Sequence, residues 1–90
     1  MDYYIHTDIQ EILSRKISIL RKKQKITQKR MSEKTGIPLS TYQRIEQLGE
    51  GSMRDFAKIL VALNRANEIN NILNISEETP MEIHERLHNG

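Results

Sequence analysis

The sequence contains no cysteine, which excludes disulfide bonds and zinc sites built on cysteine ligands. It also lacks any apolar run that approaches the roughly 18 residues a membrane helix requires, so no membrane partner is expected. The opening Met-Asp-Tyr-Tyr has no basic stretch leading into an apolar segment, so a secretory signal is not expected. Together these absences fit a cytoplasmic protein.

Several patterns that carry structure or chemistry are absent as well. No stretch alternates as a strand does and no segment repeats, so the predicted fold class is all-α. No glycine loop of the phosphate-binding form is present. His84 and His88 lie four residues apart, a spacing that suits a metal ion, but they stand near the chain end without a cysteine. We therefore expect no metal, no cofactor and no enzymatic activity.

Charge is distributed unevenly along the 90 residues, which amount to one domain. Residues 1–45 carry ten Lys and Arg against four Asp and Glu, whereas residues 46–90 carry four against eight. The formal net charge of +2 thus conceals halves of +6 and −4. Residues 15–30 hold eight basic residues and no acidic one. The alternative is an ordinary solvated lysine face, but this excess is more than solubility needs, and we favour a surface for a polyanion.

Apolar spacing predicts the first two helices. A stripe with spacings of three and four is formed by Ile5, Ile9, Ile12, Leu13, Ile17 and Leu20. It predicts a first helix over residues 8–23, begun by a capping box of Thr7 and Gln10. Thr27 as a cap, and Gly36 as a residue able to take a positive φ, predict a short second helix.

The next two helices follow from a proline and two glycines. Pro38 opens a third helix over about residues 39–47, because proline needs no N–H partner at a helix start. The Gly49-Glu50-Gly51 segment breaks the chain, and Ser52 with Asp55 caps a fourth helix. The expected core stripe of that helix is Met53, Phe56, Ile59, Leu60 and Leu63.

The last third of the chain changes in character. After an interruption at Asn64-Arg65, a short fifth helix is expected to carry Ile69, Ile72 and Leu73. We place the end of the domain at residue 75 and treat residues 76–90 as an acidic tail. Thr79, Pro80 and Glu82 are start signals for a short amphipathic helix with Met81, Ile83 and Leu87; a disordered terminus is the alternative.

One constellation in the middle of the chain has the form of a helix-turn-helix unit, two short helices joined by a tight glycine-containing turn. It consists of Gln28, Met31-Ser32, Gly36-Ile37, Tyr42 and Ile45-Glu46. Over about residues 10–73 the sequence resembles the phage-repressor/Cro family of XRE-type helix-turn-helix proteins, with Ser32 where the family commonly has alanine. The resemblance implies a five-helix lambda-repressor-like DNA-binding domain over residues 1–75, with its helix-turn-helix unit at about 27–47.

The resemblance also implies which residues meet DNA. Gln28, at the start of the second helix, is expected to bind a phosphate with the aid of the helix N-terminus; a mere helix-start role is the alternative. The positions that face base edges are Leu39, Ser40, Gln43 and Arg44. Arginine suits guanine and glutamine suits adenine, because each can form two hydrogen bonds in the major groove. Ser40 and Thr41 suit a base or a phosphate, and Leu39 suits a thymine methyl or the edge of the core.

Further contacts are implied around these residues. The expected phosphate contacts are Lys22, Lys25, Lys29 and Arg30. Backbone N–H groups near Gln47, Gly49, Gly51 and Ser52 are expected beside the sugar-phosphate chain, whereas Pro38 has none to offer. Arg21 and Glu46 stand where the family often joins its first and third helices by an ion pair; two independent surface charges are the alternative.

Three functional hypotheses follow. The first is a dimeric, sequence-specific transcription regulator that binds double-stranded DNA as a homodimer. The second is an antitoxin that also binds a toxin protein, because the Gly-Glu-Gly-Ser segment and the leucine-rich fourth helix are similar to the HipB-like antitoxin-regulator group. The third is a helical protein-interaction module, against which the uncompensated basic window argues.

Overall fold

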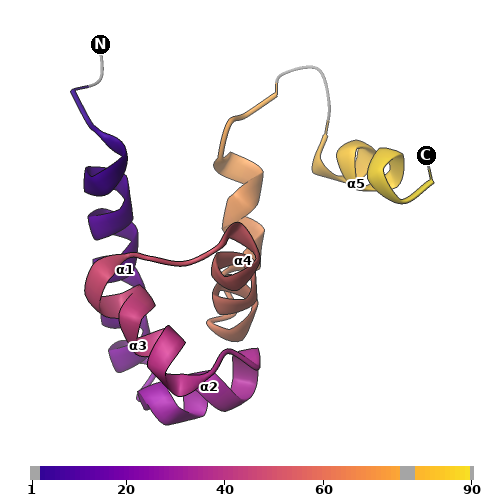
Figure 1. Ribbon diagram of the computed structural model, residues 1–90. Coiled ribbons are helices and arrows are strands. Elements are labelled where there is room, and N and C mark those ends of the chain that lie inside the picture. Colours follow the sequence, from indigo (N-terminus) through magenta and orange to yellow (C-terminus); the bar gives the residue numbers. More distant parts are fainter. Residues whose placement is uncertain (1–2, 76–78, 90) are drawn as a thin grey trace.

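The structure is a computed structural model that describes residues 3–75 and 79–89. Its helices are α1 (His6–Lys23), α2 (Gln28–Thr35), α3 (Leu39–Leu48), α4 (Met53–Ala62), the 3₁₀ helix η1 (Ala66–Asn71) and α5 (Pro80–Asn89). The described residues include no strand, so the all-α prediction is confirmed. Within the same residues, no helix combines the length and apolarity needed to cross a membrane. In Figure 1, α2 and α3 gather at one end, α1 and η1 extend toward the other, and α5 lies to one side.

The core is built from the middle of the chain. Its buried apolar side chains are Ile17, Met31, Ile37, Tyr42, Ile45, Ile59 and Leu63. Leu20, Ile26, Phe56 and Ala62 pack partly buried against them. Met31, Ile37, Tyr42 and Ile45, all members of the helix-turn-helix constellation, therefore lie in the core and pack α2 against α3. The amide of Gln24 adds a polar tie by donating to the Leu63 carbonyl oxygen at 2.9 Å, which holds the end of α1 to the end of α4.

Most predicted helix starts are confirmed by their hydrogen bonds. Thr27 Oγ1 accepts the Arg30 N–H at 3.0 Å, and Ser52 Oγ accepts the Asp55 N–H at 3.0 Å. Before α5, Thr79 Oγ1 accepts the Glu82 N–H at 3.1 Å while the Glu82 carboxylate accepts the Thr79 N–H at 3.2 Å. This reciprocal pair is a capping box, so Thr79 and Glu82 start the helix as predicted, and the tail forms a helix over 80–89.

The predicted start of α1 is wrong by two residues. The cap at Thr7 is wrong because α1 already begins at His6, and the Asp8 carboxylate accepts the Ile5 N–H at 3.0 Å in its place. The predicted start of α3 at residue 39 is confirmed, with Pro38 as its N-cap at an extended ψ of 142°.

Three apolar predictions also need correction. Met53 is 87% exposed, because it lies at the first position of α4 and the core reaches that helix only from Phe56 onward. The predicted fifth helix is a 3₁₀ segment that ends at Asn71, so Ile72 and Leu73 follow it in irregular chain. On α5, Met81 lies on the opposite side from Ile83, because two residues advance a helix by about 200°.

The apolar stripe of α1 is only partly buried. Ile17 is buried, but Ile5, Ile9 and Leu13 keep 60%, 47% and 37% of their surface exposed. The helix runs for 18 residues, whereas α3, which packs on it, has ten. The first turns of α1 therefore extend beyond the elements that could cover them.

The turn between α2 and α3 is fixed by two side chains of α2 that bond to the backbone beyond Gly36. Gly36 takes the predicted left-handed conformation, with φ 76°. Thr35 Oγ1 accepts the Ile37 N–H at 3.1 Å, and the Ser32 hydroxyl donates to the Ile37 carbonyl at 2.5 Å. Ser32 is thus more than a small replacement for alanine, because it anchors the turn that sets the angle between the two helices.

Gly49 ends α3 under a second constraint that Gly36 lacks. Both have positive φ, but a Cβ on Gly49 would lie 2.8 Å from Gln10 Cβ and 2.9 Å from the Gln10 carbonyl oxygen, whereas one on Gly36 would meet nothing. Gly36→Ala should cost about 1–2 kcal/mol in the free energy of unfolding, and Gly49→Ala about 1–3 kcal/mol more. Urea denaturation of both variants tests this, and equal losses would contradict the close approach of α3 to α1.

Candidate nucleic-acid interface

The outer face of α3 presents a single row of polar side chains. Ser40, Gln43, Arg44 and Gln47 are all exposed and follow the spacing i, i+3, i+4, i+7. Tyr42 and Ile45 hold the opposite face in the core. This row, the α3 face, thus contains two of the side chains best suited to base edges, and no ion pair or hydrogen bond within the described residues occupies the guanidinium of Arg44.

Leu39 and Thr41 lie beside the α3 face rather than on it. Thr41 is half-buried, and Leu39, the first residue of α3, keeps 37% of its surface exposed. The exposed part of Leu39 is available to an apolar group, and the rest covers the core edge. Both alternatives for Leu39 therefore stay open.

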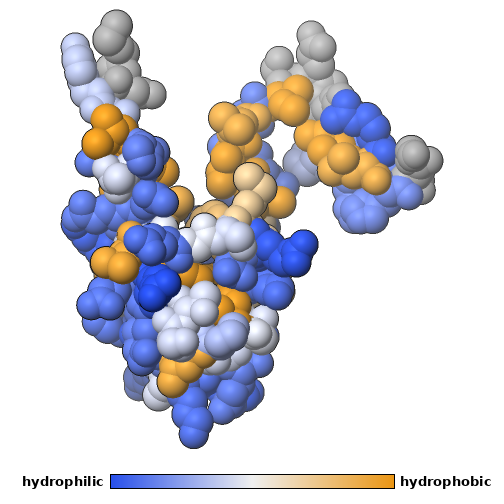
Figure 2. All heavy atoms as spheres, in the orientation of Figure 1, coloured by the Kyte–Doolittle hydropathy of each residue, from blue (hydrophilic) through white to orange (hydrophobic). Residues whose placement is uncertain are grey.

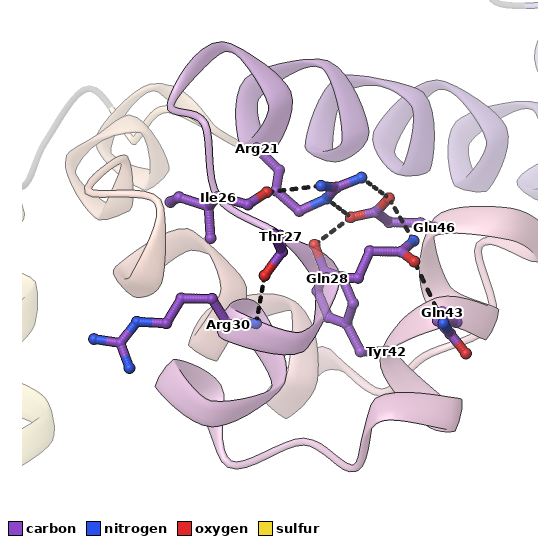
Figure 3. A network of polar contacts seen from close by, with 8 residues as sticks. All are labelled: Arg21, Ile26, Thr27, Gln28, Arg30, Tyr42, Gln43 and Glu46. Carbon is purple, nitrogen blue, oxygen red and sulfur yellow. Dashed lines mark hydrogen bonds and ion pairs between the residues drawn. The ribbon is translucent and has the colours of Figure 1, made fainter.

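Gln28 occupies the first position of α2, as predicted. Its side chain is already engaged: Nε2 donates to Glu46 at 3.2 Å, and Oε1 accepts from Gln43 Nε2 at 3.4 Å. Figure 3 shows Gln28 between these two residues of α3. The Gln28 amide thus links the start of α2 to Gln43 on the α3 face.

Cationic side chains surround this region. Lys22, Lys25 and Lys29 are exposed, and none forms an ion pair with a described residue. Arg30 pairs at 3.2 Å with Glu33, but both side chains are more than half exposed, so the pair is weak. An open polar groove of about 470 Å³ runs between α1 and α3, lined by Ser18, Arg21, Lys22, Gln28, Gln43, Glu46 and Gln47. Ser18 was missed from the sequence, although its place one turn before Lys22 puts it on the same face of α1.

The predicted ion pair between Arg21 and Glu46 is present and buried. Arg21 Nε donates to Glu46 at 2.7 Å, and the two side chains are 10% and 5% exposed. Arg21 also donates to the Ile26 carbonyl at 2.7 Å, while the Tyr42 hydroxyl donates to Glu46. Figure 3 shows donors from α1, α2 and α3 converging on this one carboxylate. We call these four residues, Arg21, Gln28, Tyr42 and Glu46, the Glu46 network.

The pKa values reflect this arrangement. Burial alone raises the pKa of the Glu46 carboxyl, but hydrogen bonds from Arg21, Tyr42 and Gln28 outweigh it and hold the pKa below its ordinary value. The hydrogen bond to Glu46 raises the pKa of Arg21, and burial raises that of Tyr42. Glu46 is therefore ionised at neutral pH, and Arg21 and Tyr42 keep their protons.

One predicted backbone donor is not available. The Gly49 N–H donates to the Ile45 carbonyl at 2.9 Å and closes α3, so it cannot also bind a phosphate.

The two histidines of α5, His84 and His88, stack with their ring centroids 4.0 Å apart. Nowhere in residues 3–75 and 79–89 do three potential metal ligands gather.

Comparison with known proteins identifies the part of the chain that forms this surface. A family model described as helix-turn-helix matches residues 17–66. No curated protein and no solved structure gives a significant match. The matched span contains α2 and α3 entire, together with every residue of the Glu46 network.

Glu46→Gln tests whether the network holds this surface together. Removing one partner of a buried ion pair should lower the free energy of unfolding by about 3 kcal/mol, or the melting temperature by more than about 10 °C in a domain of this size. Because folding lowers the pKa of Glu46, the wild-type advantage should be complete above the ordinary value of 4.5 and be lost as the pH falls through the lower folded pKa. Glu33→Gln, which removes an exposed pair, is the matched control and should cost less than about 1 kcal/mol. Equal losses in the two variants would contradict the structural role of Glu46.

Proposed function

Because the chain belongs to the Cro/repressor-like, XRE-type family of helix-turn-helix proteins, it is a sequence-specific DNA-binding transcription regulator, and we propose that its α3 face enters the major groove of DNA. The observation that carries this proposal is the exposed row of Ser40, Gln43, Arg44 and Gln47 on a helix whose other face is locked in the core. A B-DNA major groove is wide enough for one α-helix.

Arg44 and Gln43 supply the base-specific contacts in this proposal. Arg44 bonds guanine O6 and N7, and Gln43 bonds adenine N6 and N7, through two hydrogen bonds each. Ser40 and Gln47, one turn to either side, bond bases or flanking phosphates. Leu39 contacts a thymine methyl with its exposed part.

Phosphate contacts set the position of α3 along the duplex. Lys25 and Lys29 flank the start of α2, where free N–H groups and the helix dipole favour an anion. Lys22 and Arg30 extend this cationic rim. Gln28 keeps its bonds to Glu46 and Gln43, so we assign it to holding α2 against α3 and leave the phosphate to the backbone N–H groups of the first turn.

The regulator acts as a homodimer in this proposal, because one domain of this size contacts only a few base pairs. Two copies related by a two-fold axis would contact half-sites about 34–36 Å apart. The antitoxin alternative requires a second surface on this chain that binds the toxin. The exposed apolar side chains of η1 and α5 would suit either a toxin or a second copy of the chain. A homodimer accounts for them without a second protein, so we retain it as the proposal.

Arg44→Ala and Lys29→Ala distinguish base contacts from phosphate contacts. Arg44→Ala should cost about 1–3 kcal/mol and relax the preference at one base step. Lys29→Ala should weaken binding to all sequences alike and reduce the slope of log K against log salt by about one. Titrations on a selected site and on random duplex, at several salt concentrations, measure both effects. The same loss from both variants on every sequence would refute the assignment.

The homodimer is tested by the stoichiometry of the complex. Sedimentation with a palindromic site selected from random duplexes should give two chains per duplex. One chain per palindromic duplex at saturation would contradict the dimer and leave the role of Arg44 standing.

A further inference from the structure

The amino-terminal half of α1 presents an apolar face that the described chain covers only in part. Ile5, Ile9 and Leu13 follow one another at intervals of four and so lie on one side of the helix. Leu13 lines an apolar pocket that also includes Ile17 and Phe56, and Ile5 and Ile9 continue from Leu13 toward the N-terminus. We call these three residues, Ile5, Ile9 and Leu13, the α1 stripe.

The carboxy-terminal part of the chain contains a groove of about 380 Å³, the C-terminal groove. Its apolar lining includes Ile69, Ile72, Leu73, Ile75, Ile83 and Leu87. Most of the apolar members stay exposed, from 49% at Ile75 to 90% at Leu73. Leu73 also has a positive φ of 49°, a strained conformation for a bulky residue, which costs free energy without gaining burial here.

These two apolar surfaces belong to one chain but lie apart. In Figure 1, η1 lies across from the start of α1. Figure 2 shows open space between these two segments, with hydrophobic side chains on each. The described chain therefore has an apolar helical stripe and an apolar groove that do not contact each other. Because both are apolar, each could cover the other.

The amount of exposed surface also points to a missing partner. The chain exposes 7369 Å², against about 5,500 Å² for a compact monomer of 10.6 kDa. Its radius of gyration is 14.7 Å, against about 12 Å for a compact chain of this length. The excess is about 1,900 Å² per chain, and twice that falls within the roughly 2,000–5,000 Å² that stable homodimer interfaces bury.

We propose that the α1 stripe of one copy docks in the C-terminal groove of a second copy, and that the exchange is reciprocal. An amphipathic helix in an apolar groove is a common mode of association, with anchors one turn apart, and the stripe supplies three such anchors. The second copy is the favoured occupant because a two-fold pair fills both surfaces at once. In Figure 1 the first turns of α1 extend past the end of α3, far from α2, so this interface leaves the start of the α3 face uncovered. The inference rests on the proposed homodimer and specifies its interface.

Single cysteines test the interface cleanly, because the chain has none of its own. Ile9→Cys and Leu87→Cys are prepared separately, mixed without DNA and oxidised. A disulfide-linked pair containing one chain of each variant is expected, with little linkage in either variant alone. The matched control is Ile19→Cys mixed with Leu87→Cys: Ile19 is 46% exposed, close to the 47% of Ile9, but it lies off the stripe on the same helix.

Equal linkage from Ile9→Cys and Ile19→Cys, or none from either, would overturn the proposal. So would an internal disulfide in a monomeric chain that carries both Ile9→Cys and Leu87→Cys, since the groove would then hold the chain's own α1.

Ile9→Asp in the full chain should raise the dimer dissociation constant about tenfold or more, the effect of losing one buried apolar anchor. Should Ile9→Asp stay dimeric and bind a palindromic duplex normally, this interface is wrong while the proposed function stands. An unchanged base preference in Arg44→Ala would contradict the proposed function without affecting the cross-link.

Discussion

The buried carboxylate of Glu46 is the group on which the geometry of the α3 face depends. It is 5% exposed, and a charge so far from water is tolerated only while donors compensate it. Those donors come from three helices: Arg21 from α1, Gln28 from α2 and Tyr42 from α3. A change in the angle between any two of these helices would leave part of the charge unpaired. Through Gln28 the constraint also reaches Gln43, so the interior of the domain fixes the position of its outermost row.

Local features of the fold were predictable because each depends on a few neighbouring residues. Thr27 and Ser52 as caps, Gly36 in the left-handed region and the start of α5 all follow from short-range hydrogen bonds and steric limits. The errors have a different origin. Met53 and the α1 stripe fit a helical period, but periodicity reports only which side of a helix is apolar. It does not report how far the neighbouring elements reach, and that decides whether such a side is covered.

In the candidate site, too, features set by local spacing could be predicted, and features that depend on packing between helices could not. The α3 face could be predicted, because the positions of Tyr42 and Ile45 in the core leave Ser40, Gln43, Arg44 and Gln47 outward by geometry alone. The pair of Arg21 and Glu46, 25 residues apart, came only from the family resemblance, since no local spacing indicates it. The hydrogen bonds of Gln28 to Glu46 and Gln43 were not predicted by either route. They require the packed arrangement of α2 and α3, which a linear pattern does not contain.

The limits of the core separate two kinds of apolar residue in this chain. Every fully buried apolar side chain among the described residues lies between Ile17 and Leu63, close to the span 17–66 that matches the helix-turn-helix family. The α1 stripe precedes that span, and the C-terminal groove follows it. Neither is needed to close the core, yet both carry large apolar side chains whose exposure to water is costly. Exposed apolar surface of this extent is uncommon on a monomeric protein and is typical of interaction sites. In the proposed assembly, the helix-turn-helix span serves DNA, while the segments that flank it supply the surfaces through which two copies meet.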